Sequence, residues 1–108
     1  MGKKLLLVDD EENVVHALER IFVPAGYQVF SASGGEAALA LLADEKIDLV
    51  ISDMRMPGMD GHQLLKQVRS LYPTTMRAIL SGFAEGKDVI NCLRDGSARM
   101  CILKPWDN

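Results

Sequence analysis

Carboxylates stand just after two apolar runs of this sequence. Asp9 and Asp10 follow residues 5–8, and Asp53 comes two residues after the run 49–51. Such runs are typical of parallel strands that are covered on both faces. The carboxyl ends of these strands meet at one edge of a sheet, where three carboxylates would repel one another unless a cation or proton compensates. We therefore expect a site for Mg²⁺, a hard cation that prefers oxygen ligands.

Two further residues at expected strand ends suit phosphate chemistry. Ser81 closes the fourth expected strand, and Lys104 follows the fifth. A lysine supplies a positive charge, and a serine hydroxyl can donate a hydrogen bond to a phosphoryl oxygen. A carboxylate can act as the nucleophile that accepts a phosphoryl group and forms an acyl phosphate. We expect Asp53 to be this acceptor and Ser81 and Lys104 to hold the transferred group.

Alternating strands and helices must bring these side chains together. Between the apolar runs, apolar residues recur at helical spacing, as Val14, Leu18 and Ile21 do. The expected strands are residues 4–8, 27–32, 48–52, 77–81 and 100–103, and the expected helices are 12–24, 35–45, 61–71 and 86–94. Gly26 should cap the first helix, and Pro24 should fray its end. The pattern predicts an α/β fold with a doubly wound, five-stranded parallel sheet that binds ligands at the carboxyl ends of its strands.

Length and composition narrow the possible classes of protein. The 108 residues, 48% of them hydrophobic, suit one domain covering residues 1–108. The net charge of −3, without a basic stripe, argues against direct nucleic-acid binding. The first apolar run is too short for a signal peptide or a membrane span, so we expect a cytoplasmic protein with no membrane contact. Cys92 and Cys101 lack the spacing of a zinc site or a disulfide framework and are expected to be buried free thiols.

Four sequence blocks resemble the signature blocks of response-regulator receiver domains, the chemotaxis-regulator-like domains of two-component signalling. They are Leu5-Leu-Leu-Val-Asp-Asp-Glu, Asp53-Met-Arg-Met-Pro-Gly-Met-Asp-Gly, Leu80-Ser-Gly and Leu103-Lys-Pro-Trp, and they span nearly the whole chain in this order. The resemblance implies a flavodoxin-like sheet with strand order 2-1-3-4-5. The last helix of that fold is missing from the chain, so we expect a truncated N-terminal domain of a longer response regulator. Apolar surface near the first helix is then uncovered, or it is covered in a homodimer.

The resemblance also implies roles for individual residues. Asp53 would accept a phosphoryl group from a sensor histidine kinase or phosphotransfer protein, and a change of conformation would control an output domain or effector protein. Asp10 and Asp53 would coordinate Mg²⁺, Asp9 would do so directly or through water, and the main-chain carbonyl of Arg55 would add a ligand. The chain would be no enzyme acting on other molecules, but a signalling domain that catalyses only its own phosphorylation and dephosphorylation. Lys104–Pro105 is expected to be a cis peptide.

One position departs from the family pattern. Receivers usually carry an aromatic residue three positions before the lysine, and this residue changes orientation together with the serine hydroxyl on phosphorylation. Here that position is Cys101. A cysteine is small and sweeps little volume, so we expect a weakened switch between Ser81 and Cys101. Replacement by Tyr or Phe should then alter phosphorylation-dependent assembly.

Several residues also have simpler interpretations. Asp9 and Asp10 precede a helix and could cap its free N–H groups. His16 and His62 have no spaced partners and are interpreted as helix-face residues rather than ligands. Trp106 is either a packing anchor or a contact with a partner.

Two rival functions remain open at this point. An aspartyl-nucleophile phosphatase also uses Asp and Mg²⁺ at a strand end, but it needs a second Asp two residues on, where this chain has Arg55. A receiver-like interaction module that is never phosphorylated is favoured by Cys101, but the intact acidic, serine and lysine positions argue against it. The ending Lys104-Pro-Trp-Asp is similar to that of receivers fused to cyclic-di-nucleotide phosphodiesterases, a weak hint about the output domain.

Overall fold

The computed structural model describes residues 2–82 and 86–104. Strands and helices alternate in the order β1 (Lys4–Val8), α1 (Glu12–Phe22), β2 (Gln28–Ala32), α2 (Gly35–Asp44), β3 (Leu49–Asp53), α3 (Gly61–Leu71), β4 (Met76–Ser81), α4 (Gly86–Arg94) and β5 (Met100–Leu103). The five strands pair in parallel and form one sheet with the order β2-β1-β3-β4-β5. The predicted fold class and strand order are confirmed.

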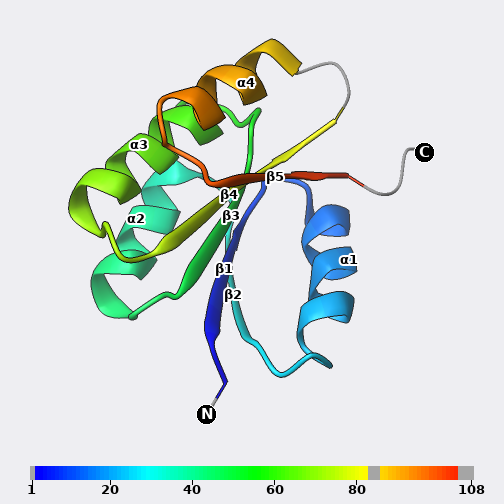
Figure 1. Ribbon diagram of the computed structural model, residues 1–108. Helices are drawn as coiled ribbons and strands as arrows, with labels where there is room; N and C mark the ends of the chain where they lie inside the picture. Colours follow the sequence, from blue (N-terminus) through cyan, green and yellow to red (C-terminus); the bar gives the residue numbers. More distant parts are fainter. Residues whose placement is uncertain (1, 83–85, 105–108) are drawn as a thin grey trace.

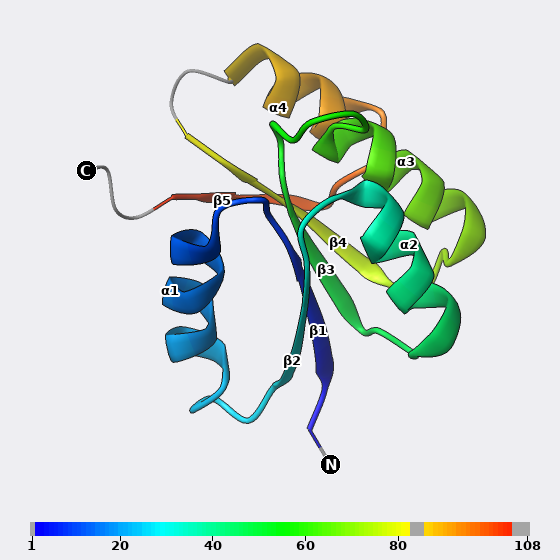
Figure 2. The ribbon, with the colours of Figure 1, turned by 180° about the vertical axis from the view of Figure 1, so that it is seen from behind.

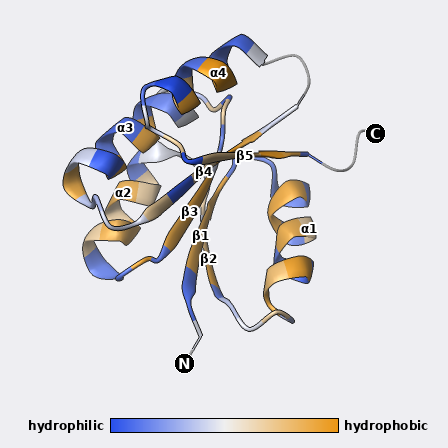
Figure 3. Cartoon of the chain, in the orientation of Figure 1, coloured by the Kyte–Doolittle hydropathy of each residue, from blue (hydrophilic) through white to orange (hydrophobic). Residues whose placement is uncertain are grey.

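The sheet is the middle layer of three (Figures 1 and 2). Helix α1 covers one face, and α2, α3 and α4 cover the other. Val14 and Leu18 of α1 pack with Leu5 and Leu7 of β1, whereas Leu6 belongs to the core on the opposite face. Because both faces are covered, the central parts of β1, β3 and β4 are mainly hydrophobic (Figure 3). This explains why the apolar runs predicted the strands.

The predicted boundaries hold to within one or two residues. The largest difference is at α1, which ends at Phe22, whereas the sequence predicted residue 24. The chain continues in turns to Gly26, which has a φ of +99°. The amide of Tyr27 donates to the Phe22 carbonyl and that of Gly26 to the Val23 carbonyl, the two hydrogen bonds of a Schellman closure. Gly26 therefore closes this end as predicted, because glycine adopts a positive φ without a steric penalty.

Apolar side chains remain exposed near α1 and on β5. Ile21 and Val23 at the end of α1 are 55% and 54% exposed, and Met100 and Leu103 of β5 are 45% and 54% exposed. These side chains agree with the expected uncovered apolar surface. Among the described residues, no helix is long and apolar enough to cross a membrane.

Candidate functional site

The three predicted acidic residues meet at the carboxyl edge of the sheet. Asp9 and Asp10 follow β1, and Asp53 is the last residue of β3, the strand beside β1. Each offers a carboxylate oxygen, and these oxygens lie within 4.8 Å of one another. Asp9 and Asp53 are buried, being 4% and 3% exposed, whereas Asp10 faces solvent. This confirms the predicted clustering of the carboxylates at one edge.

Asp9 is only partly satisfied by the protein. Its Oδ1 accepts a hydrogen bond from the amide of Glu11 at 2.8 Å, which is the helix-capping contribution that the sequence allowed. Its buried Oδ2 accepts no hydrogen bond within the described part of the chain. Burial, and then the charge of Asp53, raise the pKa of Asp9 to about 6, against the opposing effect of the Glu11 amide. A buried oxygen without a donor, beside two other carboxylates, fits a bound hard cation.

The end of β3 holds Asp53 in a crowded backbone environment. Gly61, the first residue of α3, lies so close that a Cβ there would be 2.1 Å from the Asp53 main-chain oxygen. The amide of Gly61 donates to the Met54 carbonyl, and the Ser52 hydroxyl donates to the Asp53 carbonyl. The loop between β3 and α3 therefore folds back tightly on the acceptor position. Asp60 caps α3 in a capping box with Gln63, which fixes the far end of this loop.

Lys104 reaches the acidic cluster from the end of β5. Its Nζ lies 3.2 Å from Asp53 Oδ1 and 3.7 Å from Glu11 Oε1. Its amide donates to the Ser81 carbonyl, which anchors the lysine backbone to the neighbouring strand. Burial lowers the pKa of Lys104, but the nearby carboxylates of Asp53, Asp9 and Glu11 together outweigh burial and raise that pKa above its ordinary value. The lysine is therefore charged and directed at the predicted phosphoryl acceptor.

The predicted switch residues lie on the neighbouring strands β4 and β5. Ser81 is buried at the end of β4, and its hydroxyl donates to the Gly82 carbonyl at 2.9 Å. Cys101 of β5 is half-buried and packs against the core cluster that contains the buried thiol of Cys92. Cys92 is buried as predicted, whereas Cys101 is less buried than expected, and the two cysteines form no disulfide within the described part of the chain. The proposed weak coupling between Ser81 and Cys101 remains a prediction.

Arg55 lies in the loop that follows Asp53, where a metal-ligating carbonyl was predicted. Its side chain pairs with Asp88 on the first turn of α4 at 2.9 Å, a contact that the sequence did not suggest. The Arg55 carbonyl as a ligand stays a prediction. A cavity of about 260 Å³ opens beside the acidic cluster, lined among others by Asp9, Asp10 and Ser31. Asp53 and Lys104 do not line this cavity, which therefore lies on the α1 and β2 side of the cluster.

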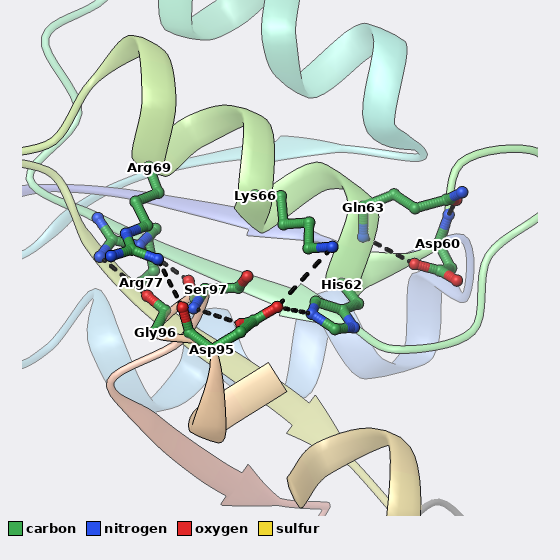
Figure 4. Close-up of polar contacts among 9 residues, drawn as sticks. All are labelled: Asp60, His62, Gln63, Lys66, Arg69, Arg77, Asp95, Gly96 and Ser97. Atoms are coloured by element: carbon green, nitrogen blue, oxygen red, sulfur yellow. Dashed lines mark hydrogen bonds and ion pairs between the residues drawn. The ribbon is translucent and has the colours of Figure 1, made fainter. Parts of the chain in front are cut away.

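Two other predictions have different outcomes. His62 is not a member of the acidic cluster, and its Nε2 lies 2.7 Å from Asp95 Oδ2 in a surface network (Figure 4). This contact agrees with its interpretation as a helix-face residue. The cis peptide expected at Lys104–Pro105 and the two roles considered for Trp106 lie outside the described residues.

Comparison with known sequences identifies the family of this chain. The sequence model of the response regulator receiver domain matches residues 5–108. The chain is 35% identical to sporulation initiation phosphotransferase F of Bacillus subtilis, over 99% of this chain and 86% of that protein. It is 36% identical to the response regulator protein FleR of Pseudomonas aeruginosa, over 99% of this chain but 22% of that protein. The chain thus spans about a fifth of the length of regulators of that kind.

Solved structures agree with the sequence relatives. The signal receiver domain of an HD domain-containing protein from Pseudomonas fluorescens is 35% identical, with a TM-score of 0.90 over 98% of this chain and 78% of that one. A chemotaxis protein of Vibrio cholerae is 29% identical, with a TM-score of 0.87 over 99% of this chain and 90% of that one. The acidic edge, the lysine that reaches it and these matches lead to one conclusion: this chain belongs to the family of response regulator receiver domains of two-component systems.

Proposed function

We propose that this receiver domain accepts a phosphoryl group on Asp53 from the histidine of a sensor kinase or phosphotransfer protein. The observation that carries the proposal is the Lys104 ammonium 3.2 Å from the Asp53 carboxylate, beside two further aspartates. A carboxylate oxygen of Asp53 attacks phosphorus, the bond from phosphorus to the donor nitrogen breaks, and that nitrogen keeps the electron pair. The product is an acyl phosphate on Asp53.

The residues around Asp53 have distinct parts in this transfer. Lys104 already contacts the acceptor, so its charge can hold a phosphoryl oxygen without a large rearrangement. Ser81 donates its hydroxyl to the Gly82 carbonyl, and rotation about one side-chain bond would turn that donor toward the phosphoryl group. Asp9, Asp10 and Asp53 would hold Mg²⁺, which neutralises charge on the transferring group when bound.

The chemistry of the domain is limited, in this proposal, to its own phosphorylation and dephosphorylation. The phosphorylated state would act on an output domain or effector protein by a shift of conformation. Among the described residues no cysteine forms a disulfide, which suits a reducing compartment, so we place this activity in the cytoplasm. The relative FleR is named a response regulator, and a regulatory output is the corresponding proposal for the protein to which this domain belongs.

The test uses a small phosphoryl donor, so that no cognate kinase is needed. The chain is incubated with acetyl phosphate and Mg²⁺, and the intact mass is measured for the addition of one phosphoryl group. Asp53→Asn should abolish the addition, and EDTA should suppress it. Asp44→Asn, which changes an exposed carboxylate at the end of α2, is the matched control and should not alter it.

The outcomes separate the proposal from its rivals. If the folded protein binds Mg²⁺ but takes up no phosphoryl group, the interaction-module function replaces the proposal. Turnover of a phosphate ester without a stable adduct would instead favour a phosphatase.

A further inference from the structure

Basic residues lie on neighbouring elements at a corner of the molecule that the phosphoryl site does not use. The corner is formed by the outer part of α3, the start of β4 and the segment from the end of α4 to the start of β5 (Figure 4). We call its five basic residues the basic corner: Lys66, Arg69, Arg77, Arg94 and Arg99. All of them except Arg77 are exposed.

Arg77 is buried beneath the basic corner and joins its segments through hydrogen bonds to main-chain carbonyls. It is 7% exposed, and its guanidinium donates to the carbonyls of Ser97 at 2.8 Å, Thr75 at 2.9 Å and Gly96 at 3.4 Å. Among the described residues, no carboxylate forms an ion pair with it. Burial lowers the pKa of Arg77, and the positive charges of Arg69 and Arg99 lower it further. The guanidinium is therefore hydrogen-bonded, but its charge is not compensated by a neighbouring acid.

The acid at this corner, Asp95, is already engaged. Its Oδ2 lies 2.7 Å from His62 Nε2 and 3.9 Å from Lys66 Nζ, and its Oδ1 accepts the amide of Ser97. Hydrogen bonds from Ser97 and His62 hold the pKa of Asp95 well below its usual range, so it stays ionised. Arg69 contacts the Asp95 main-chain oxygen at 2.5 Å rather than its carboxylate. Asp95 therefore leaves most of the positive charge of the corner exposed.

Charge is distributed unevenly over the chain as a result. The basic corner with Asp95 carries five positive charges and one negative charge, a net of +4. The whole chain has 12 basic and 15 acidic residues and a net charge of −3, so the remaining residues carry 7 positive and 14 negative charges, a net of −7. A compact positive region on an otherwise acidic domain attracts an acidic partner and orients its approach.

We propose that the basic corner docks a short acidic segment of a partner protein. A nucleic acid fits less well, because a long polyanion makes many phosphate contacts and would meet the net −7 of the remaining surface. An anionic membrane would bring the same acidic surface close to lipid headgroups over a wide area. A short acidic peptide can contact the exposed cations of the corner and stay clear of the acidic edge at Asp9 and Asp53. This inference does not depend on phosphoryl transfer.

The test measures binding of a short glutamate-rich peptide to the isotope-labelled chain by NMR. The same peptide with glutamine in place of glutamate is the neutral control. We expect saturable shifts of the backbone amides from Gly96 to Met100, and an affinity that falls as salt is raised. Arg94→Gln combined with Arg99→Gln should weaken binding at least about fivefold, because two exposed charge contacts are lost. Lys3→Gln combined with Lys46→Gln removes the same charge at exposed positions outside the corner and should change the affinity less than about twofold.

Three results would overturn the inference. Equal losses in the two double variants would show that binding follows net charge alone. If the peptide does not bind at low salt while the NMR spectrum shows an intact fold, the basic corner is not a docking surface for acidic peptides. Tighter binding of a DNA duplex or of anionic vesicles, with the same dependence on Arg94 and Arg99, would assign the corner to a different class of partner.

Discussion

Replacing Asp9 by Asn should stabilise the metal-free domain at neutral pH. The pKa of Asp9 is raised from 3.8 to about 6, mainly by burial, so the folded state binds this proton more tightly than the unfolded chain does. The ionised carboxylate of Asp9 therefore destabilises the folded state, and the free energy of unfolding falls as pH rises from about 4 to about 6. A difference of about 2 pH units at about 1.36 kcal/mol each sets an upper bound of about 3 kcal/mol on the gain. The asparagine oxygen can still accept the Glu11 amide, so the helix start keeps its hydrogen bond.

The assay is urea unfolding of both proteins in EDTA between pH 4 and pH 8. The variant and the unmodified chain should differ little near pH 4, and the variant should be more stable by about 1–3 kcal/mol above pH 6. Added Mg²⁺ should offset most or all of this difference by stabilising the unmodified chain, with a gain of about 2.7 kcal/mol at a hundred times its dissociation constant. Asp44→Asn, away from the cluster, serves as the control. Parallel pH profiles for Asp9→Asn and the unmodified chain would refute the reasoning, because Asp9 would then carry no strained charge.

Three further substitutions test how the structure supports the site. Gly61→Ala places a Cβ against the Asp53 carbonyl and should destabilise the fold by more than about 2 kcal/mol. Gly86→Ala, whose Cβ would meet open space, is the control and should be neutral or stabilising. Similar urea midpoints for the two variants would contradict this prediction. Arg77→Met leaves three carbonyls without their donor and should cost about 2–4 kcal/mol in thermal unfolding, and a loss below about 1 kcal/mol would show that water replaces the guanidinium. Asp60→Ala removes the capping box of α3 and should cost about 1 kcal/mol by urea unfolding, most of which Asp60→Ser should restore.

The fold was predictable because the strands and helices of a doubly wound sheet have distinct hydrophobic patterns in the sequence. Residues 5–8 and 49–51 read as strands since both faces of the sheet are covered, and no period-2 alternation is needed there. The end of α1 was harder to predict, because hydrogen bonds at this terminus extend past the last helical residue. At α1 the apolar pattern continues to Val23, while regular helix stops at Phe22 and the chain turns through Gly26. The hydrophobic pattern alone does not distinguish a helix that continues to Val23 from a turn that begins after Phe22.

The members of the acidic cluster were predictable for the same reason, but several of their contacts were not. Asp9, Asp53 and Lys104 each follow or end a strand, so the strand order alone brings them to one edge. The ion pair between Arg55 and Asp88 joins side chains 33 residues apart, and it depends on where α4 lies over the loop after β3. A pair of exposed charges leaves no periodic pattern in the sequence. Such contacts therefore become visible only when the helices are placed in space.

The basic corner is a second feature that the sequence did not predict. Overall charge argued against a polyanion partner, and this argument used the sum over the chain rather than its distribution. Arg69, Arg77 and Arg99 come from α3, β4 and the segment before β5, and only the fold makes them neighbours. A net charge of −3 thus conceals two regions of opposite sign, of which the acidic one is expected to bind a cation and the basic one a carboxylate-rich peptide. Because the basic corner and the acidic edge belong to different parts of the domain, we expect the affinity of a peptide for the basic corner to be the same before and after the proposed phosphorylation of Asp53.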